Sequence, residues 1–388
     1  MHLELPQNVH FIFSKLLAAG FESYLVGGCL RDLLRGKKPK DWDFTTAAEP
    51  QQILNLFPDL KINEKGLPFG TVTIIYQGKA FDISSFNQNV EKSEQTLVRN
   101  INLDLRRRDF TINALAYNHQ TGLIDLFHGQ NDLQKKIIKC IGIPEERFKE
   151  DPFRMMRAFR FASTLGFRVD HETQRAIFRN KDLTKNIPQP RWTNEFNKIL
   201  FGNYSFRTLV QYKDLVAVII PEINLVSPKT IDAMRYPSIG IVQRLVKLWY
   251  ELDNIEAVLT RLQYPIEMIN HVCKLIKYIK LPLSLDKIMI KKCMQQIGFS
   301  NFQQVLSIRK TLEYQKKKFY QDIESLVFEI LQNGECYSIQ QLAITKEVLM
   351  KEGVKETNLH TTLETILSAV IENRVINKQS AILKAKLF

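Results

Sequence analysis

Hydrophobic and polar residues follow two different patterns along the chain. In the first part, short apolar runs end at glycines and charged residues, which is typical of strands alternating with short helices. Residues 8–20 have helical spacing, and the apolar runs 71–76 and 79–86 flank Gln77-Gly78, which predicts a β-hairpin. Beyond about residue 205, apolar residues recur at helical spacing. The pattern therefore predicts an α+β region followed by an all-helical one.

The stretch 24–46, YLVGGCLRDLLRGKKPKDWDFTT, predicts a strand, a glycine turn, a helix, a basic loop and a second strand. Gly27 and Gly28 allow a sharp turn and the close approach of a bulky ligand, because neither carries a Cβ. A helix that begins there points unpaired N–H groups at that ligand, and Arg31, one turn later, can bind a phosphate. Taken alone, the two glycines indicate an ordinary turn.

Asp41 and Asp43 flank Trp42 on the second strand, so we expect both carboxylates on one face and the indole on the other. Two adjacent carboxylates repel each other unless a cation lies between them, and hard oxygen ligands favour Mg²⁺. Alone, this pair would indicate a solvated strand end. Close to a phosphate-binding turn, it indicates metal-assisted nucleotidyl transfer.

Together these positions resemble the signature of the class II tRNA nucleotidyltransferase and bacterial poly(A) polymerase family, within the DNA polymerase β superfamily. That signature has two glycines, two further residues, Arg-Asp, a basic loop and Asp-x-Asp, and every position is filled here. The resemblance implies an N-terminal nucleotidyltransferase head with a mixed β-sheet and helices, followed by an all-helical neck, body and tail. We expect these at residues 1–140, 141–205, 206–280 and 281–388, with the tail binding RNA.

The resemblance also implies the reaction: an RNA 3′-hydroxyl attacks the α-phosphate of CTP or ATP in line, assisted by two Mg²⁺ ions. Asp41 and Asp43 would be the metal ligands. The superfamily commonly carries a third carboxylate on a neighbouring strand, and Asp82, between Phe81 and Ile83, is the candidate for it. An aspartate on an edge strand that faces water is the equal alternative for Asp82.

A second motif, RRRDFTINA, occupies residues 106–114 and resembles the family's RRDxTxNA. The resemblance implies that Arg108 and Asp109 contact the sugar and triphosphate of the incoming nucleotide. We expect these two neighbours to form a local ion pair that holds the guanidinium in place. A solvated basic turn is the alternative for this segment.

Asp151, Arg154, Arg157 and Arg160 follow one another at three-residue steps and lie along one slowly drifting helix face. Asp151 precedes Pro152 and suits the N-cap of that helix, and the arginines alone fit a solvated face. On the neighbouring face, an apolar stripe predicts core packing. That stripe consists of Phe153, Met156, Phe159 and Ala162.

The same segment resembles the family's EDxxR element, in which an aspartate and an arginine read the base. A carboxylate (Asp151) accepts from the amine of cytosine or adenine, and a guanidinium (Arg154) donates to the ring nitrogen. Uracil and guanine turn a carbonyl oxygen toward the carboxylate, and each mismatched group costs about 1–3 kcal/mol. The resemblance thus makes Asp151 and Arg154 the base readers, with Arg157 and Arg160 as further nucleotide contacts.

Three segments leave the product open. Residues 87–105 predict a polar loop that is shorter than in CCA-completing members and resembles the CC-adding branch. In residues 187–200, Pro188 and Pro190 resemble the bacterial poly(A) polymerases, whereas FGTV at 69–72 resembles the tRNA enzymes. The sequence therefore predicts a tRNA nucleotidyltransferase that adds CCA, or CC alone. A poly(A) polymerase is the alternative, and a non-catalytic RNA-binding protein is the third hypothesis.

Composition bears on partner and compartment. The chain carries 54 Lys and Arg against 41 Asp and Glu, a net charge of +13 that favours a polyanion such as a tRNA 3′ end and acceptor arm. A lysine-rich proteome would give the same charge. No apolar run approaches the roughly 18 residues of a membrane span, and five scattered cysteines without a CxxC pair suit a reducing cytoplasm. Nothing in the sequence indicates an oligomeric state.

Basic clusters in the helical part could contact an RNA backbone or form solvated helix faces. The first is Lys274, Lys277 and Lys280, at three-residue steps. The second is Arg309-Lys310 with the lysines of 316–318, beside Tyr314, Phe319 and Tyr320.

Overall fold

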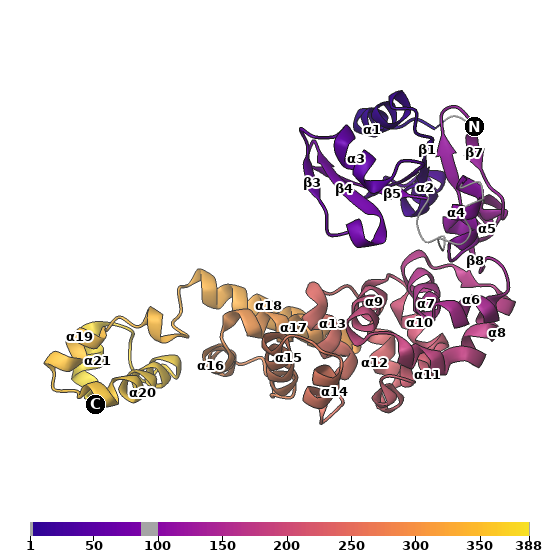
Figure 1. The fold of residues 1–388 in the computed structure, drawn as a ribbon. Coiled ribbons are helices and arrows are strands. Elements are labelled where there is room, and N and C mark those ends of the chain that lie inside the picture. Colours follow the sequence, from indigo (N-terminus) through magenta and orange to yellow (C-terminus); the bar gives the residue numbers. More distant parts are fainter. Residues whose placement is uncertain (1–2, 87–99, 388) are drawn as a thin grey trace. The chain divides into compact units, whose positions relative to one another are not determined.

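The computed structural model describes residues 3–86 and 100–387 and divides into two compact units, Met1–Pro221 and Glu222–Phe388 (Figure 1). Within those residues, the first unit holds a mixed sheet with helices and the second is helical. The predicted α+β head followed by helical regions is therefore confirmed. The finer division into head, neck, body and tail stays a prediction.

In the described part of the first unit, one seven-stranded mixed sheet has the order β3-β4-β5-β2-β1-β6-β7. Its strands are β1 (Ser23–Val26), β2 (Trp42–Thr46), β3 (Lys61–Asn63), β4 (Thr71–Tyr76), β5 (Lys79–Ser85), β6 (Ala116–Asn118) and β7 (Gly122–Ile124). Strands β2 and β5 are parallel, and their register places Asp43 beside Asp82. The predicted hairpin is β4–β5, in which Gln77 and Gly78 have φ of +50° and +72°, as a tight two-residue turn requires.

Helices cover this sheet and continue beyond it in the first unit. They are α1 (Gln7–Ala18), α2 (Gly27–Leu34), α3 (Pro50–Leu56), α4 (Ile101–Arg107), α5 (Gly129–Lys135), α6 (Pro144–Glu150), α7 (Phe153–Leu165), α8 (His171–Asn180), α9 (Gln189–Phe201), α10 (Ser205–Gln211) and α11 (Lys213–Ala217). A 3₁₀ turn, η3 (Thr111–Asn113), follows α4, and the short parallel strands β8 (Ile137–Ile138) and β9 (Arg168–Val169) pair outside the main sheet.

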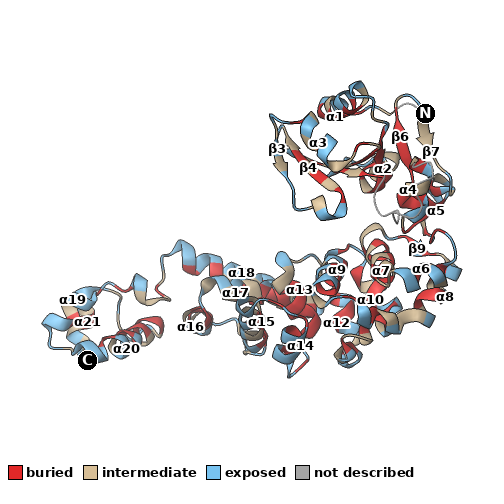
Figure 2. Cartoon of the chain, viewed as in Figure 1, coloured by how far each residue is buried: buried red, intermediate tan, exposed pale blue. Residues whose placement is uncertain are grey.

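Helix α7 is the element on which the site depends most. Its predicted apolar stripe is buried in full, and it packs against α9, which buries Trp192 and Phe196 (Figure 2). A neighbouring face of α7 carries the arginines at three-residue steps. One face therefore fixes the helix in the core, which leaves the other in a defined position.

The second unit is an array of helices packed through apolar faces, with buried residues concentrated along α13 (Figure 2). Its helices are α12 (Pro228–Ala233), α13 (Gly240–Trp249), α14 (Ile255–Arg261), α15 (Ile266–Ile279), α16 (Lys287–Ile297), α17 (Phe299–Leu312), α18 (Lys317–Gln332), α19 (Lys346–Lys351), α20 (Leu359–Ile371) and α21 (Gln379–Ala385). Across residues 3–86 and 100–387, no helix combines the length and apolar character needed to cross a bilayer.

Candidate active site

A cavity of about 490 Å³ in the first unit is lined by every residue that the sequence predicted to bind nucleotide, and by Asp43. Four further residues line it to which the sequence assigned no role: Arg107, Asn113, Phe161 and Arg191. The cavity walls come from α2, β2, the turn after α4, and α7 with α9. The motifs that are separate in sequence thus meet around one space.

The glycine turn is placed against both charges of the site. Gly27 has a φ of +68°, and a Cβ there would lie 3.4 Å from Asp43 Oδ2 and 3.4 Å from Arg108 Nη1. A Cβ on Gly28 would lie 3.6 Å from Arg31 Nη2 and 3.8 Å from Asp43 Oδ2. Helix α2 begins at this turn, as predicted, so its free N–H groups share the cavity with a carboxylate and two guanidiniums.

Asp41, Trp42 and Asp43 differ in exposure, and of these three residues it is Asp43 that lines the cavity. Trp42 is buried, Asp43 is half-buried and lines the cavity, and Asp41 lies exposed just before β2. Burial, and then repulsion from Asp82 and Asp41, raise the pKa of Asp43, whereas Arg108 and Arg31 oppose that rise. A divalent cation bound beside Asp43 would relieve the repulsion among these carboxylates.

Asp82 lies on an internal strand, because β5 runs between β4 and β2, so the edge-strand alternative is wrong. Its Oδ1 accepts a 2.6 Å hydrogen bond from Thr73 Oγ1 on β4. Among the residues that the structure describes, no group of three or more His, Cys, Asp or Glu is arranged to hold a metal ion. A cation beside Asp43 would therefore need ligands from substrate and water as well.

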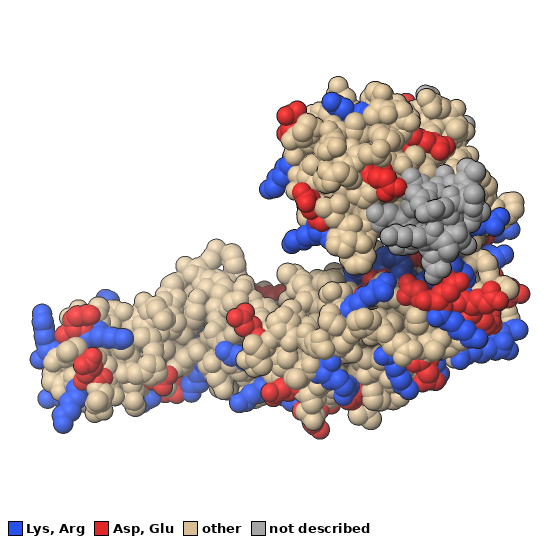
Figure 3. Space-filling model, viewed as in Figure 1, with Lys and Arg blue, Asp and Glu red and all other residues tan. Residues whose placement is uncertain are grey.

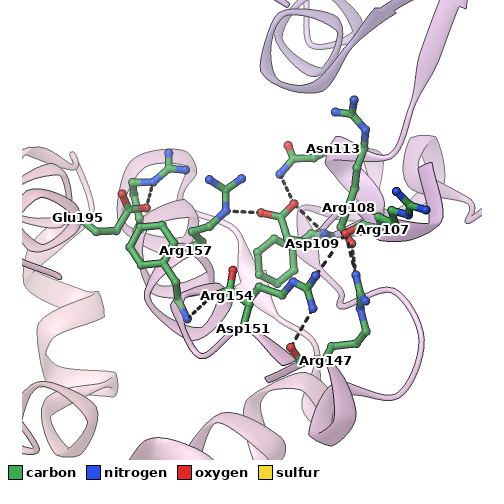
Figure 4. A network of polar contacts seen from close by, with 12 residues as sticks. Arg107, Arg108, Asp109, Asn113, Arg147, Asp151, Arg154, Arg157 and Glu195 are labelled. Atoms are coloured by element: carbon green, nitrogen blue, oxygen red, sulfur yellow. Dashed lines mark hydrogen bonds and ion pairs between the residues drawn. The ribbon is translucent and has the colours of Figure 1, made fainter. Parts of the chain in front are cut away.

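Asp109 has a different partner from the expected one. Arg108 turns back one helical turn and binds Asp104 at 2.8 Å, and Asp109 Oδ2 accepts from Arg157 Nε at 2.5 Å (Figure 4). The predicted local ion pair is therefore wrong, because the chain is extended at Arg108 and Asp109 faces α7. Burial opposes ionisation of Asp109, but Arg157, with hydrogen bonds from Asn113 and the Phe110 N–H, holds its pKa below the usual value.

Asp151 lies between α6 and α7, and its two oxygens have different partners. Oδ1 accepts from the Phe153 N–H at 3.1 Å, but the N-cap of α7 is Pro152 and the helix begins at Phe153, each one residue later than predicted. Oδ2 lies 3.7 Å from Arg191 Nη2, and the Arg191 guanidinium stacks over the Phe153 ring at 3.9 Å. Arg191 therefore contacts the carboxylate that was predicted to read the base.

Arg154 contacts protein groups in this structure. Its Nη1 donates to the Arg147 carbonyl and to Glu150, both at 2.9 Å, and Nη2 donates to the Arg107 carbonyl at 3.4 Å (Figure 4). Arg147 in turn donates to the Arg107 carbonyl at 2.7 Å. This network joins the start of α7 to the turn that carries the RRD motif.

Arg160 pairs with Glu195 of α9, whose side chain is 2% exposed, and also stacks on Phe161 at 4.1 Å. Arg31 and Arg157 approach the same ring at 5.3 and 5.5 Å. The sequence had no role for Glu195 or Phe161. One signal was available: a glutamate that shares a helix face with Trp192 needs a buried partner.

Two other predicted features lie elsewhere. Residues 87–99, which carry most of the loop that bears on CC against CCA addition, fall outside the described residues. In the second unit, Lys274 and Lys277 are exposed on α15, and Lys280 is exposed directly after it. Both alternatives, a solvated helix face and an RNA contact, fit this exposure. Figure 3 shows acidic and basic side chains interspersed over the displayed face of this unit.

The second basic cluster is partly internal. Arg309 donates to the Leu281 carbonyl at 2.7 Å and to the Tyr320 hydroxyl at 3.2 Å, and Tyr320 is fully buried. The lysines of 316–318 are exposed beside Tyr314. Arg309 and Tyr320 therefore hold helices together, and the exposed lysines are the part that a partner could reach.

Family models match three segments of the chain. The poly(A) polymerase head domain matches residues 23–139, the probable RNA- and SrmB-binding site of polymerase A matches 166–225, and tRNA nucleotidyltransferase domain 2 matches 242–385. The CCA-adding enzyme of Lactiplantibacillus plantarum is 33% identical over 392 residues, which cover 96% of this chain and 93% of that protein.

A second relative matches more closely over a shorter length. The CCA-adding enzyme of Lactobacillus delbrueckii subsp. bulgaricus is 42% identical over 217 residues, so the match spans 54% of this chain and 54% of that protein. Among solved structures, the Bacillus stearothermophilus CCA-adding enzyme in complex with CTP superposes with a TM-score of 0.82 at 25% identity, covering 98% of this chain and 96% of that one. The similarity thus extends over both units.

Proposed function

The chain belongs to the family of CCA-adding enzymes, and we propose that it is a template-independent nucleotidyltransferase that adds C and A to the 3′ end of tRNA from CTP and ATP. One observation carries the proposal: a single cavity joins the glycine turn and Asp43 to the Asp151–Arg154 edge. The groups that we propose to bind phosphate and to read the base thus line one cavity. The proposed compartment is the cytoplasm, where tRNA is matured.

Our proposal for the polar end of the substrate places the triphosphate against the α2 N-terminus, with Arg31 and Arg108 as its cationic contacts. Asp41 and Asp43 would hold Mg²⁺, and Asp82 is proposed as the third carboxylate. Bound there, the metal ions would supply charge stabilisation for the attacking 3′-hydroxyl and for the pyrophosphate leaving group. The raised pKa of Asp43 supports this assignment, since a cation relieves the repulsion that raises it.

For the base, we propose that Asp151 accepts from the amine of cytosine or adenine and that Arg154 donates to the ring nitrogen. Arg191, which lies 3.7 Å from Asp151 Oδ2, would give up this contact when the amine of the base binds. Arg154 would exchange Glu150, which is half-exposed, for the base, so this contact is cheap to break. Arg157 and Arg160 are proposed as nucleotide contacts that Asp109 and Glu195 hold in place.

The test offers the protein a tRNA transcript that ends before its CCA, with CTP and ATP singly and together, and sequences the 3′ ends. C addition followed by one A supports CCA synthesis, and termination at CC supports the inference from the short loop. Long A tails from ATP alone would replace the proposal with a poly(A) polymerase. Unchanged incorporation by Asp41→Ala would remove the catalytic role of that residue and favour another metal-binding set.

A further inference from the structure

Asn113 lies between Arg31, which is proposed to bind the triphosphate, and Asp109, which holds Arg157 of α7. It is 5% exposed, and its Oδ1 accepts from Arg31 Nη1 at 2.9 Å, whereas its Nδ2 donates to Asp109 Oδ1 at 3.1 Å. Asp109 Oδ2 then accepts from Arg157 Nε at 2.5 Å (Figure 4). A continuous chain of hydrogen bonds therefore runs from α2, through the turn η3, to α7.

At the α2 end, this chain fixes how the Arg31 guanidinium is turned. Its Nε is bound to Asp32 Oδ1 at 3.1 Å and its Nη1 to Asn113, and its Nη2 lies 3.6 Å from where a Cβ of Gly28 would stand. Asp32 and Asn113 together therefore turn the third nitrogen toward the glycine turn. Without Asn113, the guanidinium could rotate about its Nε contact.

At the α7 end, the chain fixes Arg157, which lies one turn after Arg154 on the same helix. Asp109 is 7% exposed, so its carboxylate needs all of its partners, and Asn113 and the Phe110 N–H both donate to the oxygen that Arg157 does not bind. If Asp109 Oδ1 loses the hydrogen bond from Asn113, we expect the Asp109 carboxylate to move, and with it the ion pair to Arg157 of α7.

We propose that Asn113 is a positioning residue that couples triphosphate binding at Arg31 to base discrimination by α7, which rests on the proposed function. The carboxamide suits this role because it accepts on one side and donates on the other. An aspartate could accept from Arg31 but could not donate to Asp109. A single isosteric substitution, Asn113→Asp, can therefore keep the hydrogen bond from Arg31 and remove the one to Asp109.

The experiment measures equilibrium binding to the full-length protein, without tRNA, of CTP, UTP and inorganic tripolyphosphate. It compares Asn113→Ala and Asn113→Asp with the control Asn118→Ala. Asn118 is 1% exposed on β6 and makes its own buried hydrogen bonds, for example to the Ser23 carbonyl at 3.3 Å, outside the cavity. Thermal unfolding verifies that each variant is folded, and Asn113→Ser replaces Asn113→Ala if the latter is not.

For Asn113→Ala, we expect tripolyphosphate affinity to fall about tenfold and the CTP:UTP affinity ratio to fall about tenfold, since each loss is one buried hydrogen bond. For Asn113→Asp, we expect tripolyphosphate affinity to stay within about twofold while the CTP:UTP ratio falls as in Asn113→Ala. Asn118→Ala should lower the melting temperature and leave both quantities unchanged.

A merely structural Asn113 would weaken CTP and UTP equally and leave their ratio at the wild-type value, which would overturn the proposal. Equal loss of tripolyphosphate binding in Asn113→Asp and Asn113→Ala would also overturn it. A double-mutant cycle with Arg157→Lys adds an independent readout: coupling requires that the two effects on the ratio are non-additive. Wild-type protein that prefers CTP but does not extend tRNA would refute the proposed function alone.

Discussion

Charged groups are buried in both units, but with different partners. In the first unit, Arg157 and Arg160 are bound to the carboxylates of Asp109 and Glu195. In the second unit, Arg244 and Lys247 on α13 are 6% and 1% exposed, and in the described residues their contacts are backbone carbonyls. Arg244 donates to the Met234 carbonyl, and Lys247 Nζ donates to the Tyr236 and Pro237 carbonyls at 3.3 and 3.1 Å.

The two kinds of partner differ in how well they keep a buried group charged. In the Asp109–Arg157 pair, the partner's charge compensates burial, so the pKa of Asp109 is held low and the pKa of Arg157 is raised. Arg160 is bound to Glu195, but burial still lowers its pKa. Carbonyls compensate less, so burial and the neighbouring Arg244 lower the pKa of Lys247 to about 7. The Asp109–Arg157 pair therefore stays charged, whereas the cations of α13 hold the loop between α12 and α13.

The largest effect should come from removing a carboxylate that lacks a cationic partner of its own. We expect Asp43→Asn to lower tRNA extension about a thousandfold or more, because metal-assisted charge stabilisation is lost. The same variant should be more stable by about 0.5–2 kcal/mol, since the raised pKa of Asp43 shows that its charge is unfavourable in the folded state. Primer extension and denaturant unfolding measure the two quantities. Lower stability together with lower activity would contradict this account.

Breaking a compensated pair should affect stability instead. Arg157→Ala leaves Asp109 buried and unpaired, and we expect a loss of about 3 kcal/mol in the free energy of unfolding. Arg179→Ala is the control, because its pair with Glu145 is 3.7 Å long and 65% exposed on the Arg179 side, and should cost less than about 1 kcal/mol. Equal losses in the two variants would mean that burial does not set the value of the pair.

The same pair predicts an acid dependence. Because the folded pKa of Asp109 is depressed, the stabilisation is present above the unfolded aspartate pKa of about 3.9 and is lost as pH falls through the folded value. Acid unfolding of the wild type and of Asp109→Asn should therefore differ in slope below about pH 4. Identical slopes would place the acid-sensitive group elsewhere.

An uncompensated cation predicts a second rise of stability with pH, on the alkaline side. Lys247 has a folded pKa of about 7, and its unfolded pKa is about 10.4, so the unfolded state binds the extra proton between those values. Stability from this group then rises with pH across that window, by at most about 1.4 kcal/mol per pH unit. Lys247→Met should remove this rise, which the difference between the two unfolding curves against pH isolates. A difference that does not change with pH would refute the lowered pKa.

The smallest effect should come from cations that are not buried. We expect the triple substitution of Lys274, Lys277 and Lys280 by Ala to change stability by less than about 0.5 kcal/mol per residue. If α15 faces the RNA, tRNA binding should weaken and the salt dependence of its affinity should decrease by about 1 per lost phosphate contact. The triple substitution of the lysines at 316–318 is the comparison. An unchanged salt dependence in both variants would place the RNA elsewhere.

Local patterns determined which residues meet in the cavity. Strand alternation set Trp42 apart from Asp43, the glycine pair determined where α2 begins, and the three-residue spacing brought the arginines of α7 to the cavity, with Asp151 just before the helix. These features depend on neighbours within a turn or a strand, so the sequence alone could predict them. The boundary at Phe153 differed by one residue, because Pro152 rather than Asp151 is the N-cap of the helix.

Partner choice was decided by the tertiary structure. Asp109 binds Arg157 across a sequence separation of 48 residues rather than its neighbour Arg108, and Arg160 binds Glu195 across 35. The internal position of Asp82 required the sheet order, and the carbonyl partners of Lys247 required a loop folded over α13. A motif specifies the chemical groups, but the pairing of buried charges depends on the distances that packing creates, because electrostatic attraction and desolvation are both set by the final environment.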